Sequence, residues 1–212
     1  MRNIPFFDTP FGIASLVLKE IPYSACAYIT VQSALDLDKL LEECVSFCRM
    51  VGAEKIYATG SVELRRYPLW MQVLQMQAST TDLGATSAKM EQVSDTTITD
   101  WIEIYNRKMA GIDNASYMTQ RDGKEMLSRG DGYFVCREGE RLGILMASDG
   151  KLHALASVTA GGGVECMRAL AKNCPEIPIT LEVASTNHKA IHLYKSLDFA
   201  EIGVVSSWYK IY

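Results

Sequence analysis

The sequence has no cluster of lysine or arginine residues. Its 212 residues include 21 Lys and Arg against 25 Asp and Glu, which gives a formal net charge of −4. Proteins bind nucleic acid through a basic footprint that neutralises phosphates, so nucleic acid is not expected as a partner. A weakly acidic chain can still hold one anionic ligand at a local site.

Long apolar runs are missing as well. No stretch approaches the ~18 apolar residues that a membrane-spanning helix needs. Prolines and charged residues such as Asp8 and Lys19 interrupt residues 1–22, and no small-residue cleavage site follows. This segment therefore does not resemble a signal peptide. We expect a cytoplasmic protein without a membrane partner.

The six cysteines include no Cys-x-x-Cys pair. Cys44 and Cys48 share the apolar face of a leucine-rich segment with helical spacing, which favours core thiols over a metal site. His188 and His192 are four residues apart, but Lys189 stands where the zinc-protease motif has its glutamate, and no third ligand is apparent. No metal cofactor is expected.

The composition, 48% apolar and 22% charged, predicts a folded globular protein. Apolar residues at three- and four-residue spacing predict a helix over 36–51, which Gly52 ends. With two short strands after this helix, residues 1–77 form a small α/β unit with too few elements to close a sheet alone. We expect this unit to pack on the rest of the chain. Residues 78–90, rich in Ser, Thr, Ala and Gly, are predicted to be a linker.

A new pattern begins at residue 91 and continues to residue 212. Two helices come first, followed by three strands with hairpin turns at Glu138-Gly139 and Asp149-Gly150. Helix, strand, helix and a last strand or hairpin complete the chain. This order predicts an α+β fold with a mixed sheet. The expected helices are 100–110, 123–128 and those beginning at the glycines 161–163 and at Asn187, and the expected strands are 132–139, 141–150, 151–158 and 178–185.

Three consecutive glycines, 161–163, separate a predicted strand from a predicted helix. Without Cβ atoms, their N–H groups can approach an anion closely, and the helix dipole favours negative charge there. A plain glycine turn would have the same sequence. A dinucleotide-binding start, with Glu182 as the ribose-binding acid, is a weaker alternative, because the strands precede the loop and the rest of the chain is too short for further βαβ units.

The C-terminal sequence LEVASTNHKAIHLYKSLDFAEIGVVSSWYKIY predicts a strand, a cap, a helix and a strand. The order Asn187, Ala190, Tyr194 and Phe199 resembles the closing segment of the GNAT acetyltransferase family, whose pattern N-x-x-A-x-x-L-Y-x-x-x-G-F lies beside acetyl-coenzyme A. The glycine of the pattern is Asp198 here. Aspartate can adopt the left-handed backbone conformation that a helix end often needs, so the departure is mild.

The resemblance covers residues 91–212 and implies a GNAT acyl-CoA N-acyltransferase-like fold for them. Residues 1–77 would then be a degenerate, partial GNAT-like half, although no repeat of identical residues is visible. The implied activity is transfer of acetyl from acetyl-CoA to a primary amine, on a small molecule or a peptide, by direct attack in a ternary complex. The acceptor pocket is expected from residues 111–131 and the final hairpin. A homodimer is one assembly that this resemblance allows.

The resemblance also implies the residues that hold acetyl-CoA. The strand before the glycines would contact the pantetheine arm, the glycines the pyrophosphate, and the last helix the far side of the arm. The loop has Val158 where the family usually has Arg or Gln, and it is about three residues shorter. The implied cofactor-binding residues are Ala156, Ser157, Val158, Gly161, Gly162, Gly163, Val164, Asn187, Ala190 and Tyr194.

Two residues are candidates for proton transfer. Tyr194, a phenol with an ordinary pKa of about 10, stays protonated at neutral pH and can donate to a departing thiolate. Packing on the buried helix face would equally explain a tyrosine there. His153, with an ordinary pKa near 6.5, could take the proton of the amine, although a water chain could do the same. A non-catalytic CoA-binding or regulatory module is the alternative function.

Overall fold

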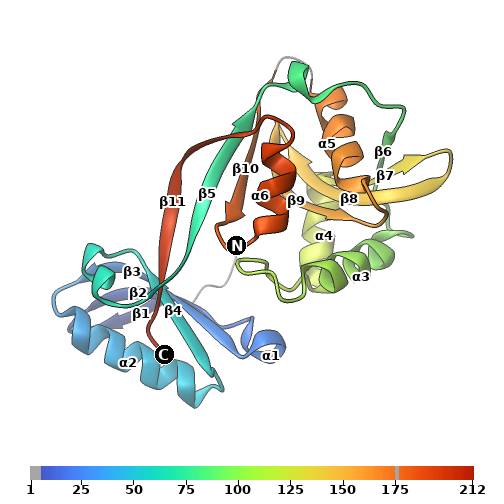
Figure 1. The fold of residues 1–212 in the computed structure, drawn as a ribbon. Helices are drawn as coiled ribbons and strands as arrows, with labels where there is room; N and C mark the ends of the chain where they lie inside the picture. The colour runs from blue at the N-terminus through green and yellow to red at the C-terminus, as the bar shows by residue number, and fades with distance from the viewer. Residues whose placement is uncertain (1–5, 175–176) are drawn as a thin grey trace. The chain divides into compact units, whose positions relative to one another are not determined.

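The computed structural model describes residues 6–174 and 177–212. The chain forms two compact units: unit 1 consists of Met1–Gln72 with Ser206–Tyr212, and unit 2 of Val73–Val205. Strands β5 (Leu69–Ala78) and β11 (Ala200–Lys210) each run from one unit into the other (Figure 1). The domain limits expected from the sequence, 1–77, 78–90 and 91–212, stay a prediction.

Unit 1 is built on a sheet with the order β1-β2-β3-β4-β11. Neighbouring strands are antiparallel except β3 and β4, which are parallel and are connected by helix α2. The bounds are β1 Phe6–Thr9, β2 Gly12–Val17, α1 Ile21–Ser24, β3 Cys26–Ala34, α2 Leu37–Met50, β4 Lys55–Thr59 and the 3-10 helix η1 Val62–Arg66.

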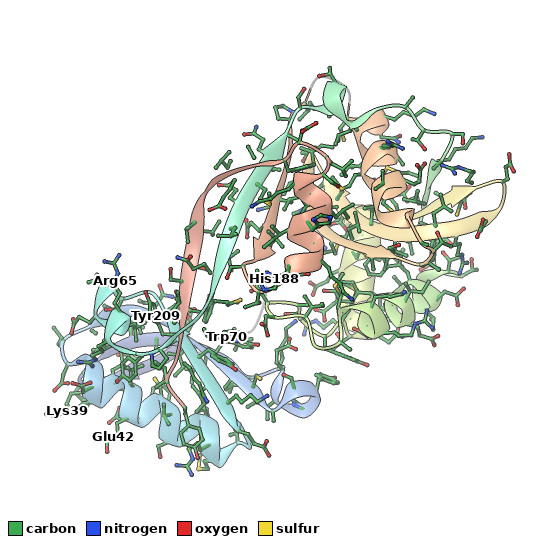
Figure 2. The ribbon with its side chains drawn as sticks, in the orientation of Figure 1. Lys39, Glu42, Arg65, Trp70, His188 and Tyr209 are labelled. Carbon is green, nitrogen blue, oxygen red and sulfur yellow. The ribbon has the colours of Figure 1, made fainter. Side chains whose placement is uncertain are left out.

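The predicted helix of unit 1 is confirmed as α2. Its apolar face is buried against the sheet, whereas Lys39 and Glu42 are exposed on the other side (Figure 2). The expectation of a unit with too few strands was wrong, because β1, β2 and β3 precede the helix. Their signal was available: Ala27, Ile29 and Val31 are buried at alternate positions of β3, the period of a strand with one face covered.

Unit 2 contains a mixed sheet with the order β5-β10-β9-β8-β7-β6. Among the described strands of this sheet only β9 and β10 pair in parallel, so the α+β class with a mixed sheet is confirmed. The bounds are β6 Lys89–Gln92, β7 Gly132–Arg137, β8 Glu140–Ser148, β9 Lys151–Ser157, β10 Ile179–Ala184, and for the helices α3 Ile98–Met109, α4 Gln120–Arg129, α5 Gly162–Asn173 and α6 His188–Lys195.

Helices cover both faces of the unit 2 sheet (Figure 1). Trp101 of α3 and Met126 of α4 lie in one core with Ile144, and Met167 of α5 and Tyr194 of α6 lie in the other with neighbours such as Leu145. Consecutive strand residues thus point into different cores, as the pleat requires. The four helices and the hairpin strands expected from the sequence are confirmed.

Two details differ from the expectation. The segment predicted as a linker contains the 3-10 helix η2 (Thr80–Leu83), and its residues Leu83 and Ala88 are buried in the core of unit 2. The last element is one long strand, β11, so the prediction of a final hairpin was wrong. The sequence from residue 200 carries only Gly203 as a turn signal, and the strand passes through it.

Candidate active site

Strands β9 and β10 separate soon after they begin. Their parallel pairing covers only Lys151 with Thr180 and Leu152 with Leu181. Both strands continue beyond this point, to Ser157 and Ala184. Backbone groups on the facing edges of the two strands are therefore left without strand partners after Leu152, and an opening lies inside the sheet.

A β-bulge lies where the strands part. On β8, Met146 and Ala147 are adjacent, but their partners on β9 are Ala154 and Leu152. His153 is the extra residue between them. A bulge bends its strand and redirects a side chain, so the bulge accounts both for the departure of β9 from β10 and for the orientation of His153.

A cavity of about 250 Å³ occupies this opening. Its wall consists of β9 from Lys151 to Leu155, β10 from Glu182 to Ala184, two residues of α6 with its cap Asn187, and residues 112–115 with two residues of α3. All of these belong to unit 2. Four residues expected at the site line it: His153, Asn187, Ala190 and Tyr194.

His153 lies in the cavity wall with Nε2 2.9 Å from Ser148 Oγ. Partial burial of the ring, together with the positive charge of Lys151, holds the pKa of His153 below its ordinary value near 6.5. The imidazole is therefore neutral at pH 7, the form that can accept a proton. Lys151 itself pairs with Glu182, with Nζ 2.7 Å from Oε1.

Tyr194 is 7% exposed and lines the cavity from α6. Its ring packs on Phe199 at a centroid separation of 5.6 Å. Burial raises the pKa of Tyr194 above its ordinary value of 10, and the nearby thiol of Cys166 adds to the shift. The phenol therefore keeps its proton throughout the neutral range. The structure combines the two interpretations of this residue, since the ring is part of the core and the side chain also borders the cavity.

Helix α6 begins and ends as the sequence predicts. Asn187 caps it, with Oδ1 accepting from the N–H of Ala190 at 3.2 Å. At the other end Asp198 has φ of 58°, the left-handed conformation expected of it in place of glycine. The cap and the terminus fix the phase of the helix, so that Ala190 and Tyr194 face the cavity.

The three glycines differ in what a side chain at each position would meet. Gly161 has φ of 74°, and a Cβ on it would meet nothing within 4 Å among the described residues. A Cβ on Gly162 would lie 2.1 Å from the carbonyl oxygen of Leu142, and one on Gly163 would lie 2.9 Å from Cδ2 of Leu193. Gly162 is thus required by packing against backbone, a side chain at Gly163 would displace only the end of the Leu193 side chain, and Gly161 faces open space.

The backbone at the glycines has free donors. The N–H of Gly162 bonds Thr159 O at 3.1 Å and that of Val164 bonds Gly161 O at 3.1 Å. Among the described residues, the N–H groups of Gly161 and Gly163 have no protein acceptor. These two donors lie at the N-terminus of α5, where the helix dipole favours an anion.

The end of β9 is less open than the resemblance implies. The N–H groups of Val158 and Thr159 both donate to Leu142 O, at 2.9 and 3.3 Å, so Val158 has only its carbonyl to offer a ligand. Ala156 is buried in the core beneath α3, and Ser157 donates to Thr159 O at 2.5 Å. These residues follow the cavity along β9 without lining it.

The first turn of α5 contains an acid, Glu165, whose charge is balanced locally. It accepts a hydrogen bond from Thr86 Oγ1 at 2.6 Å and forms ion pairs with Arg137 and, at 3.1 Å, with Arg168. The hydrogen bond from Thr86 and the charge of Arg137 hold the pKa of Glu165 below its usual value. The carboxylate is thus ionised at neutral pH, but its charge is neutralised by its partners, and it leaves the helix N-terminus able to attract an anion.

The loop between α3 and α4 was expected to border an acceptor, and its residues 112–115 line the cavity. Asn106 fixes the base of the loop, because its side chain bonds both the N–H and the carbonyl of Met118 at 2.8 and 2.9 Å. Asp113 in turn accepts from Thr186 Oγ1 at 2.7 Å. Tyr105 was not among the residues expected at the site. Tyr105 does stack on Trp101 but also borders the cavity, and periodicity cannot distinguish these positions.

No family model and no curated protein matches the sequence. Solved structures match the fold. They include a GCN5-related N-acetyltransferase from Sphaerobacter thermophilus (TM-score 0.56, 10% identity, 94% of this chain and 76% of that one). A putative acetyltransferase from Pyrococcus horikoshii gives a TM-score of 0.58 at 14% identity, over 96% and 70% of the two chains. A tandem GNAT protein of the clavulanic acid biosynthesis pathway gives 0.57 at 12% identity, over 94% and 79%.

The fold is that of the GNAT acetyltransferases. At 10–14% identity, the GNAT likeness establishes the architecture and leaves the chemistry to the residues described above. In the described part of the chain no helix is long and apolar enough to cross a membrane. Nor do residues 6–174 and 177–212 gather three or more His, Cys, Asp or Glu side chains suited to a metal ion.

Proposed function

We propose that this chain is an N-acetyltransferase that moves the acetyl group of acetyl-CoA to a primary amine of a small molecule or peptide, by direct attack in a ternary complex. The observation that carries the proposal is the opening between β9 and β10, with a cavity at the bulge and both His153 and Tyr194 in its wall. A sheet interrupted in this way has no structural purpose of its own, since it forfeits ladder hydrogen bonds.

The residues present fit the two ends of acetyl-CoA. The unpaired edges of β9 and β10 offer backbone donors and acceptors to an amide-containing arm. The free N–H groups of Gly161 and Gly163 and the dipole of α5 suit a pyrophosphate. The missing Arg or Gln at Val158 removes one side-chain contact but not these backbone donors. When bound, acetyl-CoA supplies the thioester that an amine can attack.

The side chains divide the proton transfers between them. His153, neutral at pH 7, can take a proton from the acceptor ammonium and leave a nucleophilic amine. Tyr194 keeps a proton on Oη and can offer it to the sulfur that departs. Backbone N–H groups at the open edge of β9 are placed to stabilise negative charge on the thioester oxygen, which is the part of such a reaction where electrostatic help is largest.

The alternative is a GNAT-like module that binds coenzyme A without catalysis. The short glycine loop favours it, since the segment between β9 and α5 is brief and part of its backbone is already bonded to Leu142. The presence of a proton acceptor and a proton donor in one cavity favours catalysis, because a binding module requires neither.

One experiment separates these functions. The full chain is titrated with acetyl-CoA in a thermal melt, and then incubated with acetyl-CoA and a panel of primary amines while release of free thiol is followed. We expect a rise in Tm with acetyl-CoA, since a ligand specific for the native state stabilises it, and amine-dependent thiol release. A rise in Tm without release on any amine supports the binding module. No rise in Tm contradicts both.

A further inference from the structure

Ser148 does not line the cavity, but its side chain is hydrogen-bonded to His153, which does. It ends β8, where it pairs with Lys151, and its Oγ is 2.9 Å from Nε2 of His153. Without the bulge, alternation along β9 would direct residue 153 differently, so this contact exists only because His153 is the extra residue of its strand.

The hairpin that joins the two residues is stiff. Asp149 and Gly150 have φ of 48° and 74°, the left-handed pair of a tight two-residue turn. A Cβ on Gly150 would lie 2.7 Å from Cγ2 of Ile177, so the turn is also closely packed. Ser148 is therefore presented to His153 by a turn with little freedom.

A neutral imidazole carries one N–H and one lone pair, on different nitrogens. If Nε2 holds the hydrogen, it donates to Ser148 Oγ and Nδ1 keeps the lone pair. If Nδ1 holds the hydrogen, the serine hydroxyl donates to Nε2 and no lone pair remains for a substrate. Ser148 is exposed, so its own hydroxyl hydrogen can be given to water while its oxygen accepts from the ring.

We propose that Ser148 is a positioning residue, which accepts the Nε2–H of His153 and so keeps the lone pair on Nδ1, the nitrogen available to an acceptor amine. In the proton transfer, the N–H bond of the ammonium breaks and an Nδ1–H bond forms, giving an amine and an imidazolium. The bond from Nε2 to Ser148 persists and becomes charge-assisted, so nothing has to rotate. The catalytic part of this inference rests on the proposed function, whereas the choice of ring nitrogen does not.

The charges around His153 set the pH range of such a base. Lys151 and Arg129 disfavour the imidazolium, and Glu182 and Asp131 favour it. Loss of the acceptor on Ser148 would disfavour the imidazolium further. The acidic limb of kcat/KM, which reports loss of the neutral base, should then move to lower pH in Ser148→Ala.

The test uses full-length protein labelled with ¹⁵N-histidine. The sequence has three histidines, His153, His188 and His192, and the signal lost in His153→Gln identifies His153. We expect nitrogen shifts of an Nε2–H tautomer in the wild type, a mixture of both tautomers in Ser148→Ala, and recovery of the Nε2–H form in Ser148→Thr. An Nδ1–H tautomer in the wild type, or an unchanged tautomer in Ser148→Ala, overturns the inference.

A matched control lies in unit 1, where Gln32 is also the extra residue of a bulge and donates to Ser15 Oγ at 2.8 Å. Ser15→Ala removes the same kind of bond and should leave the His153 signals and the kinetics unchanged. Ser148→Ala should lower kcat/KM for the amine on the order of tenfold, with KM for acetyl-CoA unchanged. Unchanged kcat/KM in an active enzyme refutes the catalytic role. If no amine is acetylated by the wild type, the proposed function fails, and the nitrogen shifts alone decide the tautomer.

Discussion

Each unit contains a crossover in which a helix connects two parallel strands. The two crossovers differ in how far their strands stay paired. In unit 1, β3 and β4 are paired from Cys26 opposite Lys55 to Thr30 opposite Thr59, the last residue of β4. In unit 2, β10 extends past its last pair with β9, and a cavity fills the gap. A strand pair that is closed to its end leaves no slot for a ligand, whereas one that parts early provides a slot.

The helices of the two crossovers, α2 and α5, also differ in whether their N-termini are free to bind a ligand. Helix α2 is capped by Asp36, whose carboxylate accepts from Lys39 N at 3.1 Å, and Asp38 stands in its first turn. Helix α5 has Gly161 at its N-cap position, with free N–H groups and no capping side chain. Negative charge on the cap and in the first turn of a helix disfavours a bound anion, while free N–H groups at the N-terminus can bind one. The same element order thus gives a scaffold in one unit and a site in the other.

The largest effect is expected from dividing the chain at two different places. A fragment of residues 88–212 lacks β5, which pairs along β10 from Val73 opposite Ala184 to Ala78 opposite Ile179. It should aggregate, because the edge of β10 and its apolar residues are uncovered. A fragment of 73–205 keeps that strand and should be soluble and bind acetyl-CoA.

Sedimentation and circular dichroism of the two fragments provide the comparison. Equal behaviour, whether both fold or both aggregate, would show that β5 is not what unit 2 needs.

Tyr194→Phe should lower kcat by about a hundredfold, the usual size for loss of a proton donor. The phenyl ring preserves the contact with Phe199, so affinity for acetyl-CoA should stay within a few-fold. Because burial raises the pKa of Tyr194, the wild-type rate should show no alkaline decline caused by this residue below pH 10.

Steady-state kinetics and calorimetry check both statements. Tyr209→Phe makes the same change in unit 1 and serves as the control. A variant that melts far below the wild type, or turns over at the wild-type rate, would assign Tyr194 to packing alone.

Gly161→Asp should weaken acetyl-CoA binding by about tenfold, since it places a negative charge where the N-terminus of α5 attracts an anion. This position is preferable to Gly163, where a side chain would also displace the end of the Leu193 side chain. Asp and Asn both tolerate positive φ, so Gly161→Asn is the neutral control of equal shape.

Isothermal titration of the two variants isolates the charge. If Asn and Asp weaken binding equally, the loss is steric and the phosphate site does not lie at this loop.

The smallest effect concerns Asp36 of unit 1. Asp36→Ala removes the cap of α2 and should lower Tm by about 2–4 °C without changing acetyl-CoA affinity. The hydrogen bond from the backbone of Lys39 holds the pKa of Asp36 below its ordinary value of 3.8. The stabilisation is thus present above pH 4 and lost as pH falls through the lowered pKa of the folded state, and the two melting curves should converge in acid.

Thermal melts from pH 7 to pH 2 follow this convergence. A Tm difference that persists at pH 2 would mean that the effect of Asp36 does not come from its charge.

The sequence predicts what is locally encoded. The cap at Asn187, the left-handed Asp198 and the hairpin turns at Glu138-Gly139 and Asp149-Gly150 depend on a few adjacent residues, and each lies as expected. The order of elements in unit 2 follows from periodicity in the same way. The likeness of the C-terminal pattern to GNAT proteins indicates the fold from a handful of residues, and the fold is confirmed.

What the sequence does not predict depends on contacts between distant residues. The bulge at His153 exists in the register of two strands, and the local sequence LHALAS gives no sign of it. The contacts that side chains at Gly162 and Gly163 would meet come from Leu142 and Leu193, which approach from other elements. The strands of unit 1 are a different case, because the alternation along β3 and the turn residue Pro10 between β1 and β2 were local signals for them.

Because of the order of residues along the chain, the two units are completed at different times during synthesis. Unit 2 is a continuous stretch, Val73–Val205, while unit 1 needs residues from both sides of it. Tyr209 and Lys210, which follow unit 2 in the chain, complete the edge of β4. On a ribosome the unit that carries the cavity therefore has all its residues available first, and unit 1 must wait, with β4 unpaired on that edge, until residues 206–212 emerge. Loss of those residues by premature termination would damage the scaffold and leave the sequence of the site intact.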